Sequence, residues 1–65
     1  MEIGSRIRFY RRTRKVSQGE LATLAGMAAP QLCRYEKGRS QPRLKVLVRI
    51  AEALKVPVAD FFVGE

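Results

Sequence analysis

The amino-acid sequence predicts an all-α fold, a compact domain of five short helices. Apolar residues recur at the three- and four-residue spacing of amphipathic helices, and no segment alternates with period two for long enough to form a strand. Glycine, proline and serine interrupt this spacing at short intervals, which predicts the helix ends. The 65 residues therefore fit one domain, spanning residues 1–65.

Helical spacing and capping residues define the first two helices. Apolar spacing predicts a first helix in EIGSRIRFYRRTR that ends near Arg14 or Lys15. Ser17 precedes Glu20 by three residues in SQGE, which is the capping-box pattern at a helix start. This second helix ends at Gly26, because glycine readily adopts the left-handed conformation found after a helix. Its expected apolar face consists of Leu21, Ala22, Leu24 and Ala25.

Prolines position the remaining three helices. The third helix must begin close to Pro30, because proline is tolerated only in the first turn, and it ends just before Gly38. Its inward residues are Leu32 and Tyr35. The fourth helix follows Pro42, and Pro57 ends it before VADFF, which is expected to form a short fifth helix. The expected apolar face of the fourth helix consists of Leu44, Leu47, Val48, Ile50, Ala51 and Leu54.

The charge of the chain predicts an anionic partner. Thirteen lysines and arginines stand against six acidic residues, a net charge of +7. Nucleic acid is the first candidate and an anionic membrane surface is the second. Most of the basic residues are arginines, whose planar guanidinium groups suit phosphate and guanine. No apolar run approaches the roughly 18 residues of a membrane span, so no membrane-spanning segment is expected.

The composition argues against catalytic and metal-binding functions. Cys33 is the only cysteine and the chain has no histidine, so neither an internal disulfide nor a Cys/His zinc site can form. The sequence also lacks a carboxylate cluster and a glycine-rich phosphate loop, and we expect no enzyme activity, cofactor, metal or small-molecule ligand. The absence of a disulfide framework fits a reducing compartment, the cytoplasm.

The stretch QGELATLAGMAAPQLCRYEKG forms a recognisable unit, in which the characteristic residues are Gln18, Leu21, Ala22, Gly26, Met27, Leu32 and Tyr35. It resembles the helix-turn-helix of the lambda-repressor-like family, the Cro/C1-type or XRE regulators. The segments IGSRIRFYRR, GRSQPRLKVLVRIAEALKVP and VADFF resemble the first, fourth and fifth helices of that family. The resemblance implies a sequence-specific regulator of transcription, such as a repressor, that binds double-stranded DNA.

The resemblance further implies that the third helix lies in the major groove. Arg34 is the main candidate for reading bases, because its guanidinium can bind O6 and N7 of guanine. Gln31 can pair with adenine or bind a phosphate, and Ala29 and Pro30 are the other base-reading candidates. Alternatively, folding alone accounts for the start of this helix, where Ala28 replaces the family's usual serine or threonine. The phosphate-binding candidates are Gln18, Lys37, Arg39 and Arg43, the last of which can alternatively enter the minor groove.

The resemblance also implies a structural ion pair. In this family an arginine of the first helix pairs with a buried glutamate at the end of the recognition helix, and Arg11 and Glu36 occupy the matching positions. The alternative is an exposed Glu36 that makes only weak contacts with its helix neighbours. Cys33 is expected to be a small, partly buried residue, and a thiol switch of DNA binding is the alternative.

The apolar C-terminal segment predicts a homodimer. Phe61 is expected to complete the core with Val56 and Val58, which leaves further apolar surface nearby. The resemblance implies a two-fold interface in this region, and a dimer reads two half-sites of a palindromic or pseudo-palindromic operator about 34–36 Å apart. The interface candidates are Phe62, Val63 and Val46. The alternative is that both phenylalanines belong to the core.

A protein-binding adaptor that uses the same fold is the alternative function, because a fold does not determine function. A toxin-neutralising antitoxin and a transcriptional coactivator are examples of this class. An adaptor has no need to keep Arg34, Gln18 and a basic rim on one surface. These residues are all present here, which favours DNA binding.

Overall fold

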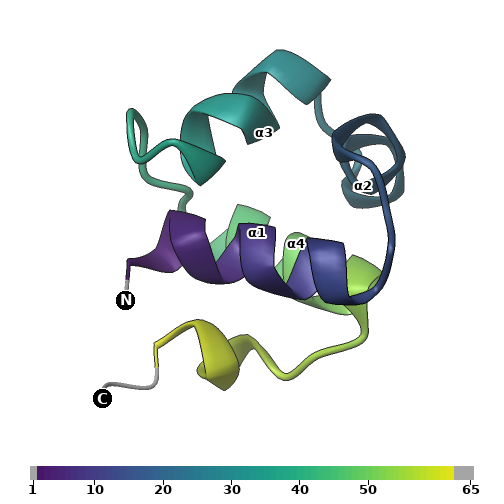
Figure 1. Cartoon of the computed structure of the whole chain (residues 1–65). Coiled ribbons are helices and arrows are strands. Elements are labelled where there is room, and N and C mark those ends of the chain that lie inside the picture. Colours follow the sequence, from purple (N-terminus) through teal and green to yellow (C-terminus); the bar gives the residue numbers. More distant parts are fainter. Residues whose placement is uncertain (1, 63–65) are drawn as a thin grey trace.

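The computed structural model describes residues 2–62, which form four α-helices and one 3₁₀ helix (Figure 1). Their bounds are α1 Ile3–Thr13, α2 Gln18–Ala25, α3 Ala29–Glu36, α4 Leu44–Leu54 and η1 Val58–Phe61. No strand occurs in the described part of the chain, so the all-α class is confirmed. The short fifth helix expected in VADFF is present only as the 3₁₀ helix η1, so a count of five α-helices is not confirmed. After Pro57, the backbone N–H of Asp60 bonds to a carbonyl three residues back, which is the 3₁₀ pattern, and the segment is too short to continue as an α-helix.

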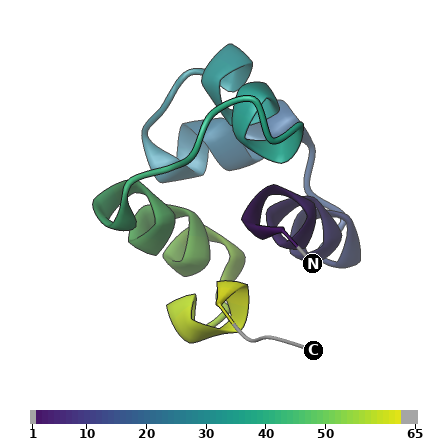
Figure 2. The ribbon, with the colours of Figure 1, turned by 90° about the vertical axis from the view of Figure 1, so that its left-hand side faces the viewer.

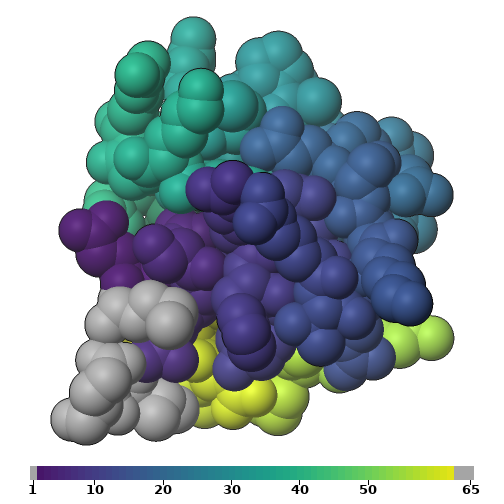
Figure 3. Space-filling view, in the orientation of Figure 1, coloured from purple at the N-terminus to yellow at the C-terminus, as the bar shows by residue number. Residues whose placement is uncertain are grey.

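The helices pack around a single centre. In Figure 1, α1 and α4 lie in the middle, α3 at the top, α2 at the upper right and η1 at the bottom. Helix α2 packs against α3 and α4, α3 packs against α1, and η1 packs against α1 and α4. Figure 2 shows the same order from the side, with α3 and η1 again at opposite ends of the molecule. Helix α1 crosses the face shown in Figure 3, with the α3 region above it and η1 below.

Every element contributes to the core. The buried apolar residues are Ile7, Leu21, Ala22, Ala25, Leu32, Tyr35, Leu47, Ile50, Ala51, Leu54 and Phe61. Two leucines assigned to apolar faces from the sequence do not belong to this set, because Leu24 is 64% exposed and Leu44 is 63% exposed. Leu24 lies beyond the arc of α2 that α3 and α4 cover, and Leu44 is the first residue of α4. Val48 is only partly buried.

The ends of α2 match the prediction. The side chain of Ser17 accepts a hydrogen bond from the backbone N–H of Glu20 at 3.0 Å, and the Glu20 carboxylate accepts one from the N–H of Ser17 at 2.9 Å. This confirms the capping box. Hydrogen bonding of the Glu20 carboxylate to Ser17, first to its backbone N–H and then to its side chain, holds the pKa of Glu20 below its usual value. Gly26 ends the helix with φ 70°.

Two lysines adopt a backbone conformation that the sequence did not indicate. Lys15, after α1, and Lys55, after α4, have φ values of 58° and 59°. Helix α1 ends at Thr13, slightly before the predicted end, and the chain then turns through Lys15. Arg14 donates a side-chain hydrogen bond to the carbonyl of Lys55 at 3.2 Å, which joins the two turns.

Helix α1 lies unusually close to the end of α3. A Cβ atom on Gly4 would clash with the carbonyl oxygen of Tyr35 and lie 3.1 Å from that of Glu36. Glycine is therefore the residue that permits this approach, which brings the side chains of α1 within reach of the C-terminus of α3. No helix in residues 2–62 has the length and apolar character needed to cross a membrane.

Candidate nucleic-acid interface

A buried ion pair lies where α1 meets the end of α3. The Arg11 Nε donates to Glu36 Oε2 at 2.7 Å and its Nη2 donates to Oε1 at 3.1 Å, which is a bidentate arrangement. The side chain of Glu36 is only 3% exposed and that of Arg11 is 12% exposed. The remaining Arg11 Nη1 donates to the carbonyl of Val16 at 2.9 Å. Glu36 is therefore not the exposed acid of the alternative reading.

Gln18 joins the same carboxylate. Its side-chain amide, Nε2, donates to Glu36 Oε1 at 3.0 Å, so one carboxylate is shared by residues of α1 and α2. Sequence reasoning assigned Gln18 only to phosphate. Because Nε2 carries two hydrogens, the bond to Glu36 leaves one donor and fixes the orientation of the amide. The carboxylate thus sets the positions of three helices and of a side chain at the start of α2.

The outward side of α3 carries two predicted base-reading residues together. Arg34 is exposed, and its Nη1 lies 3.5 Å from Gln31 Oε1. Gln31 Nε2 lies 3.5 Å from the hydroxyl oxygen of Ser40, in the loop after α3. Both contacts are long, so they guide the side chains weakly and leave them free to exchange for other partners. The opposite side of α3 buries Leu32 and Tyr35, as predicted.

The start of α3 has no side-chain cap. Ala28 occupies the N-cap position without a side-chain hydrogen bond, and Pro30 is exposed in the first turn. Ala29 packs partly against the core, so it offers less surface to a ligand than the sequence suggested. The first backbone N–H groups of a helix have no partner within the helix. At this helix start Pro30 has no N–H, and the N–H of Gln31 bonds to the carbonyl of Ala28 at 3.1 Å, so the missing side-chain cap leaves few open donors.

Exposed cations surround α3. Lys37 caps the C-terminus of α3, and Arg43 occupies the N-cap position of α4. Arg39 lies between them in the loop, and Gly38 turns the chain there with φ 76°. These three basic side chains are all exposed. The loop therefore presents positive charge at both of its ends.

The predicted dimer residues are only partly described. Phe61 is buried, whereas Phe62 is 56% exposed, so the two phenylalanines do not both belong to the core. Val46 is half-buried in the first part of α4. Val63 lies outside the described residues. Cys33 is also half-buried, between the inward and outward sides of α3.

Three features of the site were not found from the sequence. They are the bond between Gln18 and Glu36, the contact between Gln31 and Ser40, and the close approach at Gly4. Each joins residues that are distant along the chain or separated by a loop, and none produces a periodic or capping pattern. Arg8 was also not assigned to the site, although its spacing from Arg12 was visible.

The chain belongs to the helix-turn-helix family. The family model matches residues 7–61, which include every helix except the first turn of α1. This confirms the lambda-repressor-like resemblance, and α2 and α3 are the two helices of the motif.

Relatives and solved structures carry the names of transcriptional regulators. An uncharacterised HTH-type transcriptional regulator of Sinorhizobium medicae is 37% identical over 62 residues, covering 95% of this chain and 45% of the relative. The HTH-type transcriptional repressor RghR of Bacillus subtilis is 38% identical over 55 residues, covering 83% of this chain and 41% of the relative. The structure of SinR, the master regulator for biofilm formation of Bacillus subtilis, in complex with DNA superposes with a TM-score of 0.89. It is 32% identical, and the match covers 94% of this chain and 98% of that chain.

These similarities fix the class of the domain. The chain spans less than half the length of the two curated relatives described. The fold is that of helix-turn-helix regulators rather than that of an enzyme, as predicted.

Proposed function

We propose that this chain binds double-stranded DNA in a sequence-specific manner and regulates transcription, with α3 in the major groove. The observation that carries the proposal is the two-sided character of α3. One side is fixed in the protein by Leu32, Tyr35 and Glu36, and the other carries the exposed Arg34 and the half-buried Gln31. The similarity to SinR, whose structure was determined with DNA, supports this use of the surface.

Arg34 is the residue assigned to base recognition. Its guanidinium is exposed and lies beside the Gln31 amide, so it can form a bidentate contact with O6 and N7 of guanine. Gln31 can then pair with an adjacent adenine or a phosphate. Pro30 and the exposed part of Ala29 supply only apolar contacts, for example with a thymine methyl group.

The surrounding donors are assigned to the phosphate backbone. Lys37, Arg39 and Arg43 lie around the loop after α3, and Gln18, which lines a cavity together with Lys37, has one amide hydrogen free. These groups neutralise phosphates without reading sequence, and they place α3 in its groove. The bond from Gln18 to Glu36 connects this contact to the buried ion pair. The ion pair therefore helps to orient the phosphate contacts relative to α3.

Selection from a random pool of DNA duplexes tests the function. We expect one preferred duplex to emerge with a guanine at a position that Arg34 reads. Arg34→Ala should weaken binding to that duplex by about 1–3 kcal/mol and relax the preference at that position alone. Recovery of no preferred sequence would contradict DNA reading and favour the protein-binding adaptor.

Lys37→Gln is the matched comparison for Arg34→Ala. It removes one positive charge from the phosphate-binding surface, so it should weaken all duplexes alike. The slope of log affinity against log salt should fall by about 0.9. A sequence-dependent effect of this variant would show that the roles of Lys37 and Arg34 are assigned wrongly.

The proposal includes a homodimer in the cytoplasm, formed through Phe62, Val46 and Val63. The support for it is the exposed side chain of Phe62, which directly follows η1, and η1 packs against α4, the helix that carries Val46. Figure 2 shows the start of α4 and η1 on the face turned to the viewer. Such a dimer would select a palindrome with half-sites about 34–36 Å apart.

Sedimentation tests the dimer. The chain should sediment as a dimer in the presence of the selected duplex, and Phe62→Glu should give a monomer with the same thermal melt. A monomer at high micromolar concentration, with and without the duplex, would refute the dimer. The selected sequence would then consist of a single half-site.

A further inference from the structure

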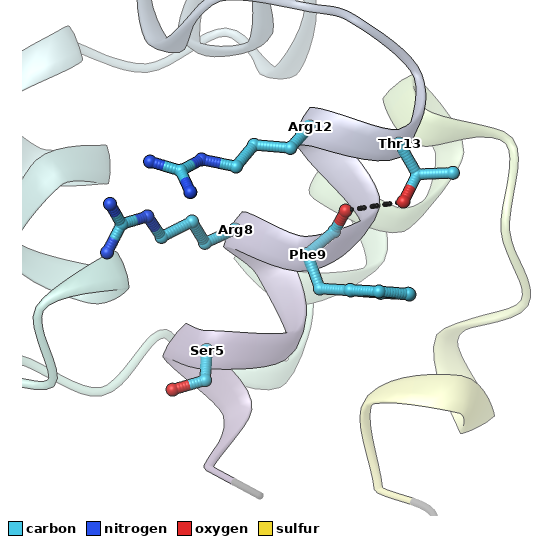
Figure 4. A pocket seen from close by; sticks show the side chains of 5 residues that line it. All are labelled: Ser5, Arg8, Phe9, Arg12 and Thr13. Atoms are coloured by element: carbon cyan, nitrogen blue, oxygen red, sulfur yellow. Dashed lines mark hydrogen bonds between the residues drawn. The ribbon is translucent and has the colours of Figure 1, made fainter.

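Two arginines on α1 extend in parallel from the surface of the molecule. Arg8 and Arg12 are one helical turn apart, and Figure 4 shows both side chains pointing the same way. Both are exposed, and neither makes a hydrogen bond or an ion pair within residues 2–62. Like charges at this spacing repel each other, so helix formation alone does not account for the pair.

Arg8 also lines a small polar cavity beside the ion pair. This cavity has a volume of about 160 Å³ and is lined by Arg8, Arg11, Gln18, Glu36 and Lys37. Glu36 accepts three hydrogen bonds from Arg11 and Gln18, and its single negative charge is paired with Arg11. Arg8 and Lys37 therefore face the cavity with uncompensated positive charge. A group with the size and charge of a phosphate suits such a site.

We propose that Arg8 and Arg12 extend the DNA-contacting surface onto α1, where they bind backbone phosphates next to those bound by Gln18 and Lys37. The inference rests on the proposed function and adds a second element to the interface. The inference is supported by the continuity of the surface, because Arg8 lines the same cavity as Gln18 and Lys37, which are assigned to phosphate. Paired guanidinium groups also match the geometry of phosphate oxygens.

The alternative occupant, an acidic protein segment, fits this surface less well. Such a segment would combine its carboxylates with an apolar contact. The large apolar side chain of that groove is Phe9, which is 55% exposed and lines it together with Arg8 and Arg12. In Figure 4 the Phe9 ring points away from the side on which the two guanidinium groups extend. The side that carries the charges thus has no apolar anchor among the residues of that groove.

The double variant Arg8→Gln and Arg12→Gln tests the inference on the duplex recovered by selection. Loss of two phosphate contacts should lower the salt slope by about 1.8 and weaken binding roughly tenfold or more near 0.1 M salt. Base preference should stay unchanged. The thermal melt should also stay unchanged or rise slightly, because both side chains are exposed and repel each other.

The matched control is Arg49→Gln with Lys55→Gln. These exposed residues line a different groove, together with Thr23 and Glu52, and their removal lowers the net charge by the same amount. We expect the control to change the salt slope far less than the double variant on α1. Equal effects of the two double variants would overturn the inference, because total charge would then explain both.

Shortening the duplex gives a second readout. Base pairs are removed from each end until the affinity difference between the wild-type chain and the α1 double variant disappears, while Lys37→Gln still weakens binding. If the wild-type chain and the α1 double variant bind with equal affinity at every duplex length, the inference is overturned and the acidic protein segment is favoured. Failure of the wild-type chain to bind any duplex would instead overturn the proposed function itself.

Discussion

Helices α2 and α3 have the same length of eight residues but are stabilised in different ways. Helix α2 satisfies its own ends, through the capping box of Ser17 and Glu20 and the left-handed Gly26. Helix α3 starts at Ala28 without a side-chain cap, and its end is held by the bonds of Glu36 to other helices. Local interactions therefore define α2, whereas tertiary contacts define α3.

This difference suits the two roles of the motif. The strong start of α2 holds Gln18 in place, where its amide reaches Glu36. The start of α3 has no capping side chain, and it lies on the surface proposed to enter DNA. A helix anchored at its far end keeps its orientation while its first turn stays available to a ligand.

The largest expected effect comes from breaking the tertiary anchor of α3. Glu36→Gln or Arg11→Met leaves one buried charge or polar group without its partner, so each should cost about 3–5 kcal/mol in the free energy of unfolding. That loss is comparable to the whole stability expected for so small a domain. Combining the two should cost clearly less than the sum. Urea and thermal melts followed by circular dichroism measure this, and small additive losses would show that the pair does not anchor α3.

A pair of glycine substitutions separates helix propensity from tertiary packing. Gly4→Ala should destabilise the domain by about 1–3 kcal/mol, because its methyl group would collide with backbone atoms at the end of α3. Gly19→Ala in α2 should stabilise it by up to about 1 kcal/mol, because the only neighbouring atom is 3.9 Å away and alanine favours the helix. Melting curves of both variants give opposite signs. A stabilising Gly4→Ala would contradict the close crossing of α1 and α3.

Removing the N-cap of α2 and adding one to α3 should reduce the difference in stability between the starts of the two helices. Ser17→Ala removes a working N-cap and should cost about 1 kcal/mol, whereas Ala28→Ser adds one to α3 and should gain a similar amount. The backbone of Ala28 already has the extended conformation of an N-cap residue, with φ −81° and ψ 140°. Chemical denaturation measures both changes. If Ala28→Ser proves neutral, the start of α3 is not limited by its missing cap.

The smallest expected effect is a dependence on pH that comes from α2. The lowered pKa of Glu20 means that its contribution to stability is fully present above its ordinary value of about 4.5. The contribution is lost as the pH falls through the lower value of the folded state. Ser17→Ala should flatten the stability curve in this acidic range, and Glu20→Gln should do the same. An unchanged curve in both variants would show that the capping box does not contribute to acid sensitivity.

Sequence patterns predicted much of the fold, and their failures have clear causes. The helix boundaries near Ser17, Gly26 and Gly38 were predicted because these signals act over a few residues. Leu24 and Leu44 were wrongly assigned to buried apolar faces. Helical spacing gives the direction of a side chain, but it does not show whether a neighbouring helix packs over it. The left-handed lysines lie in the turns after α1 and α4, which the bond from Arg14 to the carbonyl of Lys55 joins.

The site was predicted less completely than the fold. Family resemblance paired Arg11 with Glu36, and the structure brings them together, but it gave no sign that Gln18 shares the same carboxylate. The contact of Gln31 with Ser40 depends on the path of the loop after α3. The cavity that joins Arg8 to Lys37 depends on the crossing of α1 and α3.

The sequence by itself determined the approximate positions of the four α-helices, the capping of α2 and the excess of positive charge. These properties arise from residues that are neighbours along the chain, or from composition alone. Only the tertiary structure decided which charges are buried and which are free. Arg11 and Arg8 lie one turn apart on the same helix, yet the first is enclosed with Glu36 and the second is exposed to solvent. The difference arises because α3 packs against only one part of α1, and the residue pattern of α1 does not predict which part.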